Sequence, residues 1–299
     1  MTDATNREFD AWADEVSRGL TEREITLEPP RAFFESESSE EPAWVADDRP
    51  SSVRRGDESG RSKRAEAGDD PVLFFAPHAT SLPALITLLR LGEPFRLCRV
   101  DNAPERLARF ADLHPWSPPP LLRTAGGELG EQLAILLHLS LKGARAGFLP
   151  PAGTAERDRF FELFGFLERT VLPSLEMASE ADRSPGADDL RNLAEANLLE
   201  ALFRIDRQLK GRHYLLGSTY TVLDALFFAL ARWANRRLEL KHCTPEVHKY
   251  LLRMSREREV QLALRLLGDL PLIAAPPEYL GTVDLEAFED ESAPALAVT

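Results

Sequence analysis

Three stretches decide the fold of this 299-residue chain: PVLFFAPHATSLP (residues 71–83), WSPPPLL (116–122) and GEQLAILLHL (130–139). The first holds a short apolar run, Val72–Phe75, which predicts a buried strand. A turn follows, and then an apolar-periodic helix over Ser81–Leu91 with Gly92 just beyond its end. The second and third stretches predict a proline corner and another apolar helix.

The segments between these stretches complete one domain. Phe95–Val100 predicts a second strand, and Pro104–Leu113 a short helix. Residues 121–129 predict a tight hairpin, because the glycines in its turn allow positive φ. Glu131–Leu141 predicts a helix. The resulting order of strands and helices predicts an α/β thioredoxin-like domain over residues 71–142.

Beyond Thr154 the hydrophobic period becomes helical and stays so, which predicts an all-α helical-bundle domain over residues 154–268. The expected helices are Ala155–Met177, Leu190–Leu209, Val222–Asn235, Pro245–Met254 and Glu257–Leu267. Thr221 and Asp224 are spaced to cap one of these helices. Trp233 is expected to pack in the core of this domain. Residues 269–299 are predicted to form an acidic tail.

The net charge of −13 is concentrated at the two ends of the chain. Residues 1–70 hold 19 acidic and 10 basic side chains, and residues 282–299 hold five acidic and no basic ones. Residues 1–70 are predicted to be a mostly disordered acidic extension with a possible short helix at 5–19. That helix is either a docking element for a protein partner or a fraying helix in a tail. No basic face predicts a nucleic-acid partner.

The chain contains two cysteines, Cys98 and Cys243, which are far apart and form neither a CxxC pair nor a metal spacing. The six histidines also lack a metal spacing, so no metal is expected. No segment has the length and apolarity of a membrane span, and no leader-like segment is found. These features predict a cytoplasmic protein without membrane association.

In their order and spacing, several short motifs resemble those of cytosolic glutathione S-transferases, most closely the bacterial beta class. The resemblance covers roughly residues 71–266 and rests on Phe74-Phe75-Ala76-Pro77, Ser81-Leu82, Pro118-Pro119-Pro120-Leu121, Glu131, Gly153-Thr154-Ala155-Glu156-Arg157, Tyr214-Leu215-Leu216-Gly217, Thr221-x-x-Asp224-Ala225 and Arg232-Trp233-Ala234-Asn235. It implies a thioredoxin-like domain followed by a helical bundle, and a homodimer. It also implies transfer of the glutathione thiolate to a small electrophile, with glutathione as a substrate.

The resemblance places Thr80 and Ser81 beside the glutathione sulfur, as catalytic residues. A helix N-terminus favours a thiolate through its dipole and free N–H groups, and a hydroxyl can donate to the sulfur. Thr80 stands where the beta class has a cysteine, so it cannot form a mixed disulfide with glutathione. The alternative is that Thr80 or Ser81 only caps the helix. His78, in the same turn, is either a donor or base toward the ligand or a surface residue.

The remaining site residues are also implied by the resemblance. Pro119 and Pro120 would hold the backbone of glutathione, and Glu131 and Gln132 its γ-glutamyl end. If Pro120 is the cis-proline, Pro119 offers no N–H, which removes a hydrogen bond worth about 0.5–1.5 kcal/mol. These departures leave open a non-catalytic binding or scaffold module with a degenerate site. Glutathione-assisted isomerisation or dehalogenation is a third alternative.

Overall fold

The computed structural model describes residues 70–76, 80–100, 104–114, 118–268 and 274–288. The described residues belong to one unit, spanning residues 66–299. The predicted extension over residues 1–70, including the possible helix at 5–19, lies almost entirely outside the described residues. None of the described helices is long and apolar enough to cross a membrane.

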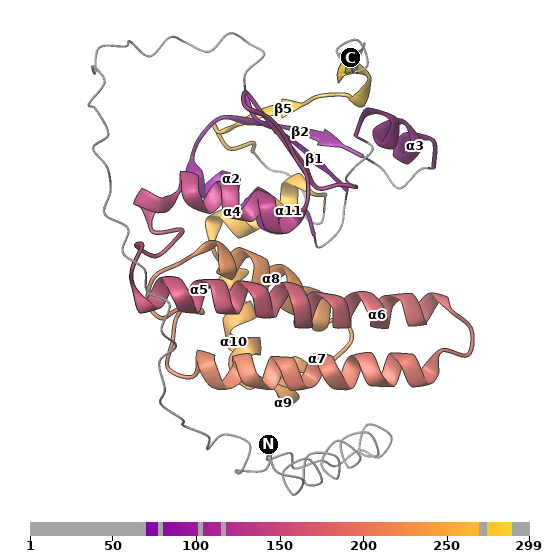
Figure 1. Cartoon of the computed structure of the whole chain (residues 1–299), viewed down its shortest axis with the longest axis vertical. Coiled ribbons are helices and arrows are strands. Elements are labelled where there is room, and N and C mark those ends of the chain that lie inside the picture. Colours follow the sequence, from indigo (N-terminus) through magenta and orange to yellow (C-terminus); the bar gives the residue numbers. More distant parts are fainter. Residues whose placement is uncertain (1–69, 77–79, 101–103, 115–117, 269–273, 289–299) are drawn as a thin grey trace, which may run out of the picture. The chain divides into compact units, whose positions relative to one another are not determined.

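A five-stranded mixed sheet forms the N-terminal part of this unit, with the strand order β4-β3-β1-β2-β5 (Figure 1). Its strands are β1 Val72–Phe75, β2 Phe95–Arg99, β3 Leu121–Thr124, β4 Gly127–Leu129 and β5 Tyr279–Thr282. Strand β1 is buried along its whole length and has a neighbouring strand on each edge. It pairs in parallel with β2 through a helical crossover and antiparallel with β3.

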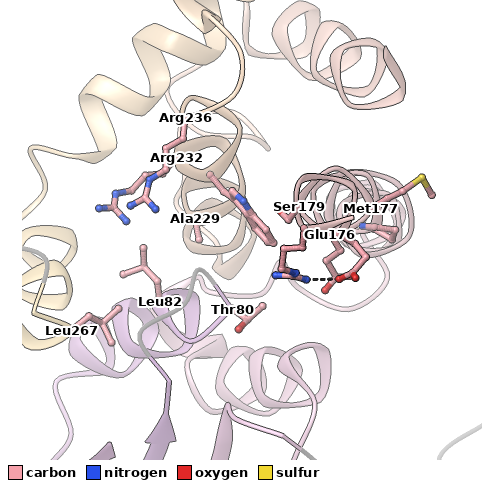
Figure 2. A pocket seen from close by; sticks show the side chains of 13 residues that line it. Thr80, Leu82, Glu176, Met177, Ser179, Ala229, Arg232, Arg236 and Leu267 are labelled. Carbon is pink, nitrogen blue, oxygen red and sulfur yellow. Dashed lines mark hydrogen bonds and ion pairs between the residues drawn. The ribbon is translucent and has the colours of Figure 1, made fainter. Parts of the chain in front are cut away.

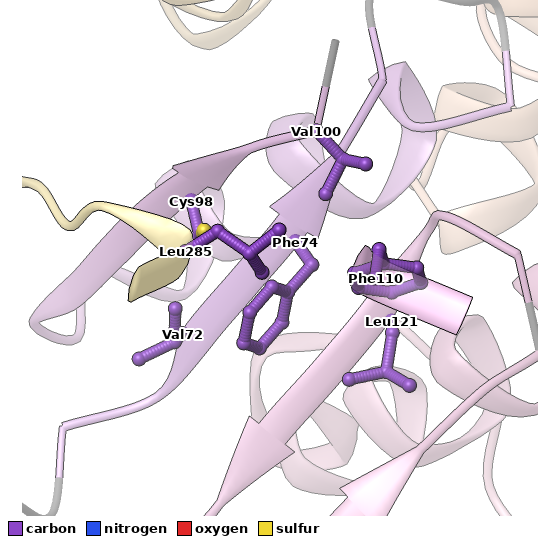
Figure 3. Close-up of a cluster of buried hydrophobic side chains, with 7 residues drawn as sticks. All are labelled: Val72, Phe74, Cys98, Val100, Phe110, Leu121 and Leu285. Carbon is purple, nitrogen blue, oxygen red and sulfur yellow. The ribbon is translucent and has the colours of Figure 1, made fainter. Parts of the chain in front are cut away.

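Alternate residues of the strands face opposite sides of the sheet. On one side Val72, Phe74, Cys98, Val100 and Leu121 form a cluster with Phe110 of helix α3, which spans Pro104–Leu113 (Figure 3). Two helices, α2 (Leu82–Leu91) and α4 (Gln132–Lys142), pack against each other elsewhere in this domain. Helix α2 is buried almost throughout because it also packs against two helices of the C-terminal domain.

The C-terminal domain is helical, as the sequence predicts. Its helices are α5 Ala155–Phe166, α6 Leu172–Arg183, α7 Asp188–Leu209, α8 Val222–Ala234, α9 Leu240–Cys243, α10 Pro245–Met254 and α11 Arg258–Leu266. Helices α5 and α6 are joined by a π-helical turn, η3, at Leu167–Val171, and α6 packs alongside α7 (Figure 1). The two contacts of α2 with this domain are made by α8 and α11. Two 3-10 turns, η2 (Ala144–Ala146) and η4 (Leu285–Phe288), complete the described elements.

The start of α8 is fixed by the capping box that the sequence predicts. The carboxylate of Asp224 accepts hydrogen bonds from the backbone N–H groups of Leu215 and Thr221, both at 2.9 Å, and from the Thr221 hydroxyl at 3.3 Å. The Tyr250 hydroxyl donates to the same carboxylate at 3.0 Å. Burial raises the pKa of Asp224 to about 6. The pair is therefore part of a folding element in the domain core.

Strand β5 and η4 were not predicted from the sequence, which assigned residues 269–299 to an acidic tail. Strand β5 instead pairs in parallel with β2 at an edge of the sheet. Leu285 of η4 is fully buried in the cluster around Phe74, and the Phe288 ring lies 4.9 Å from the Phe74 ring. The acidic charge of this segment conceals its strand, because only a few apolar residues make the contacts.

Candidate functional site

A cavity of about 820 Å³ lies where the start of α2 meets the helical domain (Figure 2). The N-terminal domain contributes Thr80 and Leu82 to its lining. Helices α6 and α8 contribute most of the remaining wall. The other lining residues are Pro173, Glu176, Met177, Ser179, Glu180, Arg183, Ala229, Arg232, Trp233, Arg236 and Leu267. Its size is in the range of small-molecule sites, and its walls combine apolar and charged groups.

Thr80 and Ser81 lie at the entry to α2 but have different environments. Thr80 is partly exposed and lines the cavity. Ser81 is fully buried, and its hydroxyl has no hydrogen-bond partner among the described residues. The Ser81 side chain does not cap α2, so capping is excluded as the role of that hydroxyl. An unsatisfied buried hydroxyl costs folding free energy and has unused capacity to donate and to accept.

The proline corner lies at the β1 end that leads toward α2. The Pro119–Pro120 peptide bond is cis, and Pro120 is buried. Phe74 is paired with Leu121 in the antiparallel ladder, so the next pair in register is Phe75 with Pro120. The fold thus places Pro120 beside the C-terminal end of β1. Phe75 is buried and carries no hydroxyl.

Glu131 occupies an unusual backbone position directly before α4. Its φ of 63° is positive, and it is the one non-glycine residue of the described chain in that region. A residue with a side chain is strained there, and such positions cluster at ligand-binding sites. The Glu131 side chain is exposed. Its carboxylate is thereby available to a ligand at the start of α4.

Gln132 is already engaged by the helical domain. Its side chain is buried, and its amide nitrogen donates to the Glu168 carboxylate at 3.1 Å. Glu168 belongs to the π-helical turn, and burial raises its pKa, while the Gln132 bond opposes that shift. The amide oxygen of Gln132 has no partner within the described structure. The side-chain amide of Gln132 has two N–H groups that could donate to the γ-glutamyl carboxylate of glutathione. One of them is already used by Glu168.

The predicted site residues fall into two groups. Thr80 lines the cavity, whereas the lining does not include Ser81, Pro119, Pro120, Glu131 or Gln132. His78 lies outside the described residues. The described residues also contain no cluster of acidic, histidine or cysteine side chains suited to a metal ion.

The cavity wall on α6 and α8 was missed by the sequence analysis. Trp233 was expected in the core but is half-buried and lines the cavity, so that prediction is wrong. Arg232 and Arg236, four residues apart, line it as well. In the sequence, this wall could have been recognised from two arginines four residues apart that flank a tryptophan near the end of an apolar helix.

Cys98 does not line the cavity. It lies in the cluster around Phe74, where burial raises its pKa to about 12.

Comparison with known proteins finds several similar glutathione transferases. No protein-family model matches the chain. Glutathione S-transferase GstA of Escherichia coli O157:H7 is 28% identical over 201 residues, which cover 66% of this chain and 98% of the relative. Glutathione S-transferase GST-4.5 of Xanthomonas campestris is 28% identical over 200 residues, with the same coverage. Among solved structures, a glutathione transferase from Methylococcus capsulatus superposes with a TM-score of 0.60 at 26% identity, covering 67% of this chain and all of that one.

The chain is similar to bacterial glutathione S-transferases in both sequence and fold. The beta-class enzyme of Sphingomonas chungbukensis, with a TM-score of 0.58 and 26% identity over 67% of this chain, agrees with the bacterial resemblance seen in the motifs. The predicted fold class, a thioredoxin-like domain followed by a helical bundle, is confirmed. The relatives are matched over nearly their whole length, whereas a third of this glutathione S-transferase-like chain lies outside the match.

Proposed function

We propose that this protein transfers glutathione to a small electrophile through a thiolate held at the start of α2. The single observation that carries the proposal is the Ser81 hydroxyl, which is buried and has no partner among the described residues, and which directly follows the cavity-lining Thr80 in the chain. Such a hydroxyl gains a hydrogen bond when an acceptor arrives. A thiolate is an acceptor, and a hydrogen bond to a charged group contributes about 1.5–3 kcal/mol.

The chemistry needs only a stabilised thiolate and an oriented electrophile. The α2 N-terminus contributes its dipole to the negative sulfur, and the Thr80 and Ser81 hydroxyls would donate to it. The sulfur then forms a bond to the electrophilic carbon, the leaving group departs with its electron pair, and the thiol proton passes to water. The electrophile would occupy the 820 Å³ cavity, on the helical-domain side of Thr80.

The rest of glutathione would lie along the sheet edge toward α4. Pro120 and the carbonyl of Pro119 would position its cysteinyl backbone, with one hydrogen bond fewer because Pro119 lacks an N–H. The exposed carboxylate of Glu131 is suited to the γ-glutamyl ammonium group, and the remaining N–H of Gln132 to its carboxylate. His78 is proposed as an additional donor in the turn before α2.

Other properties follow from the family by analogy and are part of the same proposal. They are a homodimer, a cytoplasmic location, the division into domains at 71–142 and 154–268, and a protein-binding role for the segment at 5–19. Relatives of known structure include one complexed with glutathione and a ternary complex of BphK. These descriptions belong to those proteins and serve here as the reason for choosing glutathione as the test ligand.

Two measurements test the proposal. Isothermal titration with glutathione up to millimolar concentration should show binding, and 1-chloro-2,4-dinitrobenzene should be conjugated. The double variant Thr80→Ala, Ser81→Ala should lose most of the conjugation rate without any loss of stability. Ser140→Ala is the matched control, because Ser140 is equally buried but its hydroxyl donates to the Leu137 carbonyl at 2.8 Å. Absence of glutathione binding would count decisively against the proposal.

A second candidate is a binding or scaffold module that keeps the fold without the transfer reaction. The specific observation in its favour is that the Gln132 amide already donates to Glu168, in a site whose Pro119 also lacks an N–H. This candidate predicts weak glutathione binding and no conjugation above the uncatalysed rate. Conjugation that the Thr80→Ala, Ser81→Ala variant abolishes would exclude it.

A further inference from the structure

We infer that the electrophile taken by this cavity is an anion, selected by Arg236. The inference rests on the proposed function and adds the class of the second substrate. Arg236 lies just beyond α8, and its side chain lines the cavity together with Arg232. Figure 2 shows both arginines on the α8 side of the cavity and Glu176 on the α6 side.

The arginines of the cavity lining differ in whether they have an ion-pair partner. Arg183 forms an ion pair with Glu180 three residues earlier on the same helix, so those two charges offset each other. Arg236 is exposed, and within the described ranges no ion pair or side-chain hydrogen bond involves it. Its guanidinium group therefore faces a ligand space with its five donors available. A carboxylate matches that planar fork better than any neutral group.

The other walls fix where the anionic end must lie. Glu176 lies across the cavity on α6, and partial burial in the cavity wall raises its pKa. A second negative charge next to Glu176 would be repelled, so the ligand's anionic group is directed to the α8 side. Trp233 on α8 and Met177 on α6 add apolar side chains to the cavity lining. The arrangement suits an aromatic or other apolar body that carries a carboxylate at one end and its reacting carbon toward Thr80.

A matched pair of electrophiles turns this inference into a measurement. The anionic member is 4-chloro-3,5-dinitrobenzoate and the neutral member is 4-chloro-3,5-dinitrobenzamide. In both, the glutathione sulfur forms a bond to the ring carbon and chloride leaves with the bonding electrons, while the thiol proton passes to water. After correction for the uncatalysed rates, we expect kcat/KM to favour the benzoate by about fivefold, the upper range for an exposed ion pair.

Variants separate Arg236 from general charge effects. Arg236→Ala should remove the preference for the benzoate over the benzamide. Arg256→Ala is the matched control, since Arg256 is also an exposed arginine and does not line the cavity. It removes the same charge and should keep the preference. The wild-type preference should also shrink in 0.5 M NaCl, because salt screens exposed charges.

Equilibrium binding gives a readout that does not need the reaction. Isothermal titration with unreactive 3,5-dinitrobenzoate and 3,5-dinitrobenzamide should show the same roughly fivefold preference, lost in Arg236→Ala and kept in Arg256→Ala. Equal affinities, or a preference that survives Arg236→Ala, would overturn the inference even if neutral electrophiles are conjugated. Failure to conjugate either electrophile overturns the proposed function instead. In that case the binding preference alone decides whether the cavity selects an anion.

Discussion

Replacing Ser81 with alanine should raise the stability of the protein and weaken glutathione binding at the same time. In the folded protein the Ser81 hydroxyl is fully buried and has no hydrogen-bond partner in the part of the chain that the structure describes. In the unfolded chain the same hydroxyl is hydrated. Folding therefore carries a desolvation cost of about 1–3 kcal/mol that Ser81→Ala removes. Loss of the oxygen leaves only a small void, so we expect a net gain of about 1 kcal/mol.

The binding effect has the opposite sign. If the hydroxyl donates to the glutathione thiolate, its removal costs about 1.5 kcal/mol, the lower end for a hydrogen bond to a charged group. That energy corresponds to about a tenfold rise in the dissociation constant. A substitution that merely disturbed the fold would lower stability and affinity together. Opposite signs are therefore the signature of a hydroxyl held ready for a ligand.

Urea unfolding and isothermal titration on the same preparations measure the two effects. Ser140→Ala supplies the contrast, because it deletes a satisfied buried hydroxyl and should destabilise by about 1 kcal/mol without changing glutathione affinity. If Ser81→Ala instead lowers stability by a similar amount, the hydroxyl has a structural partner in the free protein. The reasoning that assigns it to the thiolate would then be refuted.

Three further substitutions test the scaffold by urea unfolding. Asp224→Asn should destabilise by about 2 kcal/mol, because an amide cannot accept hydrogen bonds at both of its terminal atoms. Burial raises the pKa of Asp224 to about 6, so protonation of this carboxyl group favours the folded state. The difference in unfolding free energy between wild type and Asp224→Asn should therefore fall as the pH rises from 4 through 6. A difference that does not change with pH would contradict this. Arg90→Ala should destabilise by about 2 kcal/mol, since the Arg90 guanidinium lies 3.8 Å from the Tyr220 ring centre and forms an ion pair with Glu257. Arg90→Lys should keep part of this stabilisation. Leu285→Ala should cost about 3 kcal/mol, and a neutral result would show that η4 does not belong to the core.

Local periodicity was enough to predict most elements from the sequence. The predicted helix Pro245–Met254 coincides with α10, and Val222–Asn235 differs from α8 by one residue. Both have clear start signals and strong hydrophobic periodicity. The predicted helix Ala155–Met177 is interrupted by the π-helical turn and continues to Arg183. Periodicity does not reveal such a turn, because one extra residue shifts the apolar face without ending the helix.

Features that depend on distant pairing could not be read from the sequence. Strand β5 is defined by its pairing with β2, about 180 residues earlier, and its own sequence YLGT carries no clear alternation. The cavity wall also depends on contacts between segments that are far apart in the sequence. Arg236 looks like an ordinary solvated charge until the packing of α2 on α8 brings Thr80 and the end of α8 to a shared cavity.

The two ends of the proposed glutathione site differ in what binding would require of them. At α2, the Ser81 hydroxyl has no hydrogen bond to another described residue, so a ligand there gains an interaction without breaking one of those. At α4, the Gln132 amide is shared with Glu168, and a ligand carboxylate would approach a buried acid whose pKa is raised. Free energy of binding should therefore come chiefly from the sulfur end and from the exposed carboxylate of Glu131. This asymmetry is why the Ser81 hydroxyl, more than the γ-glutamyl pocket, separates a transferase from a scaffold that has only kept the fold.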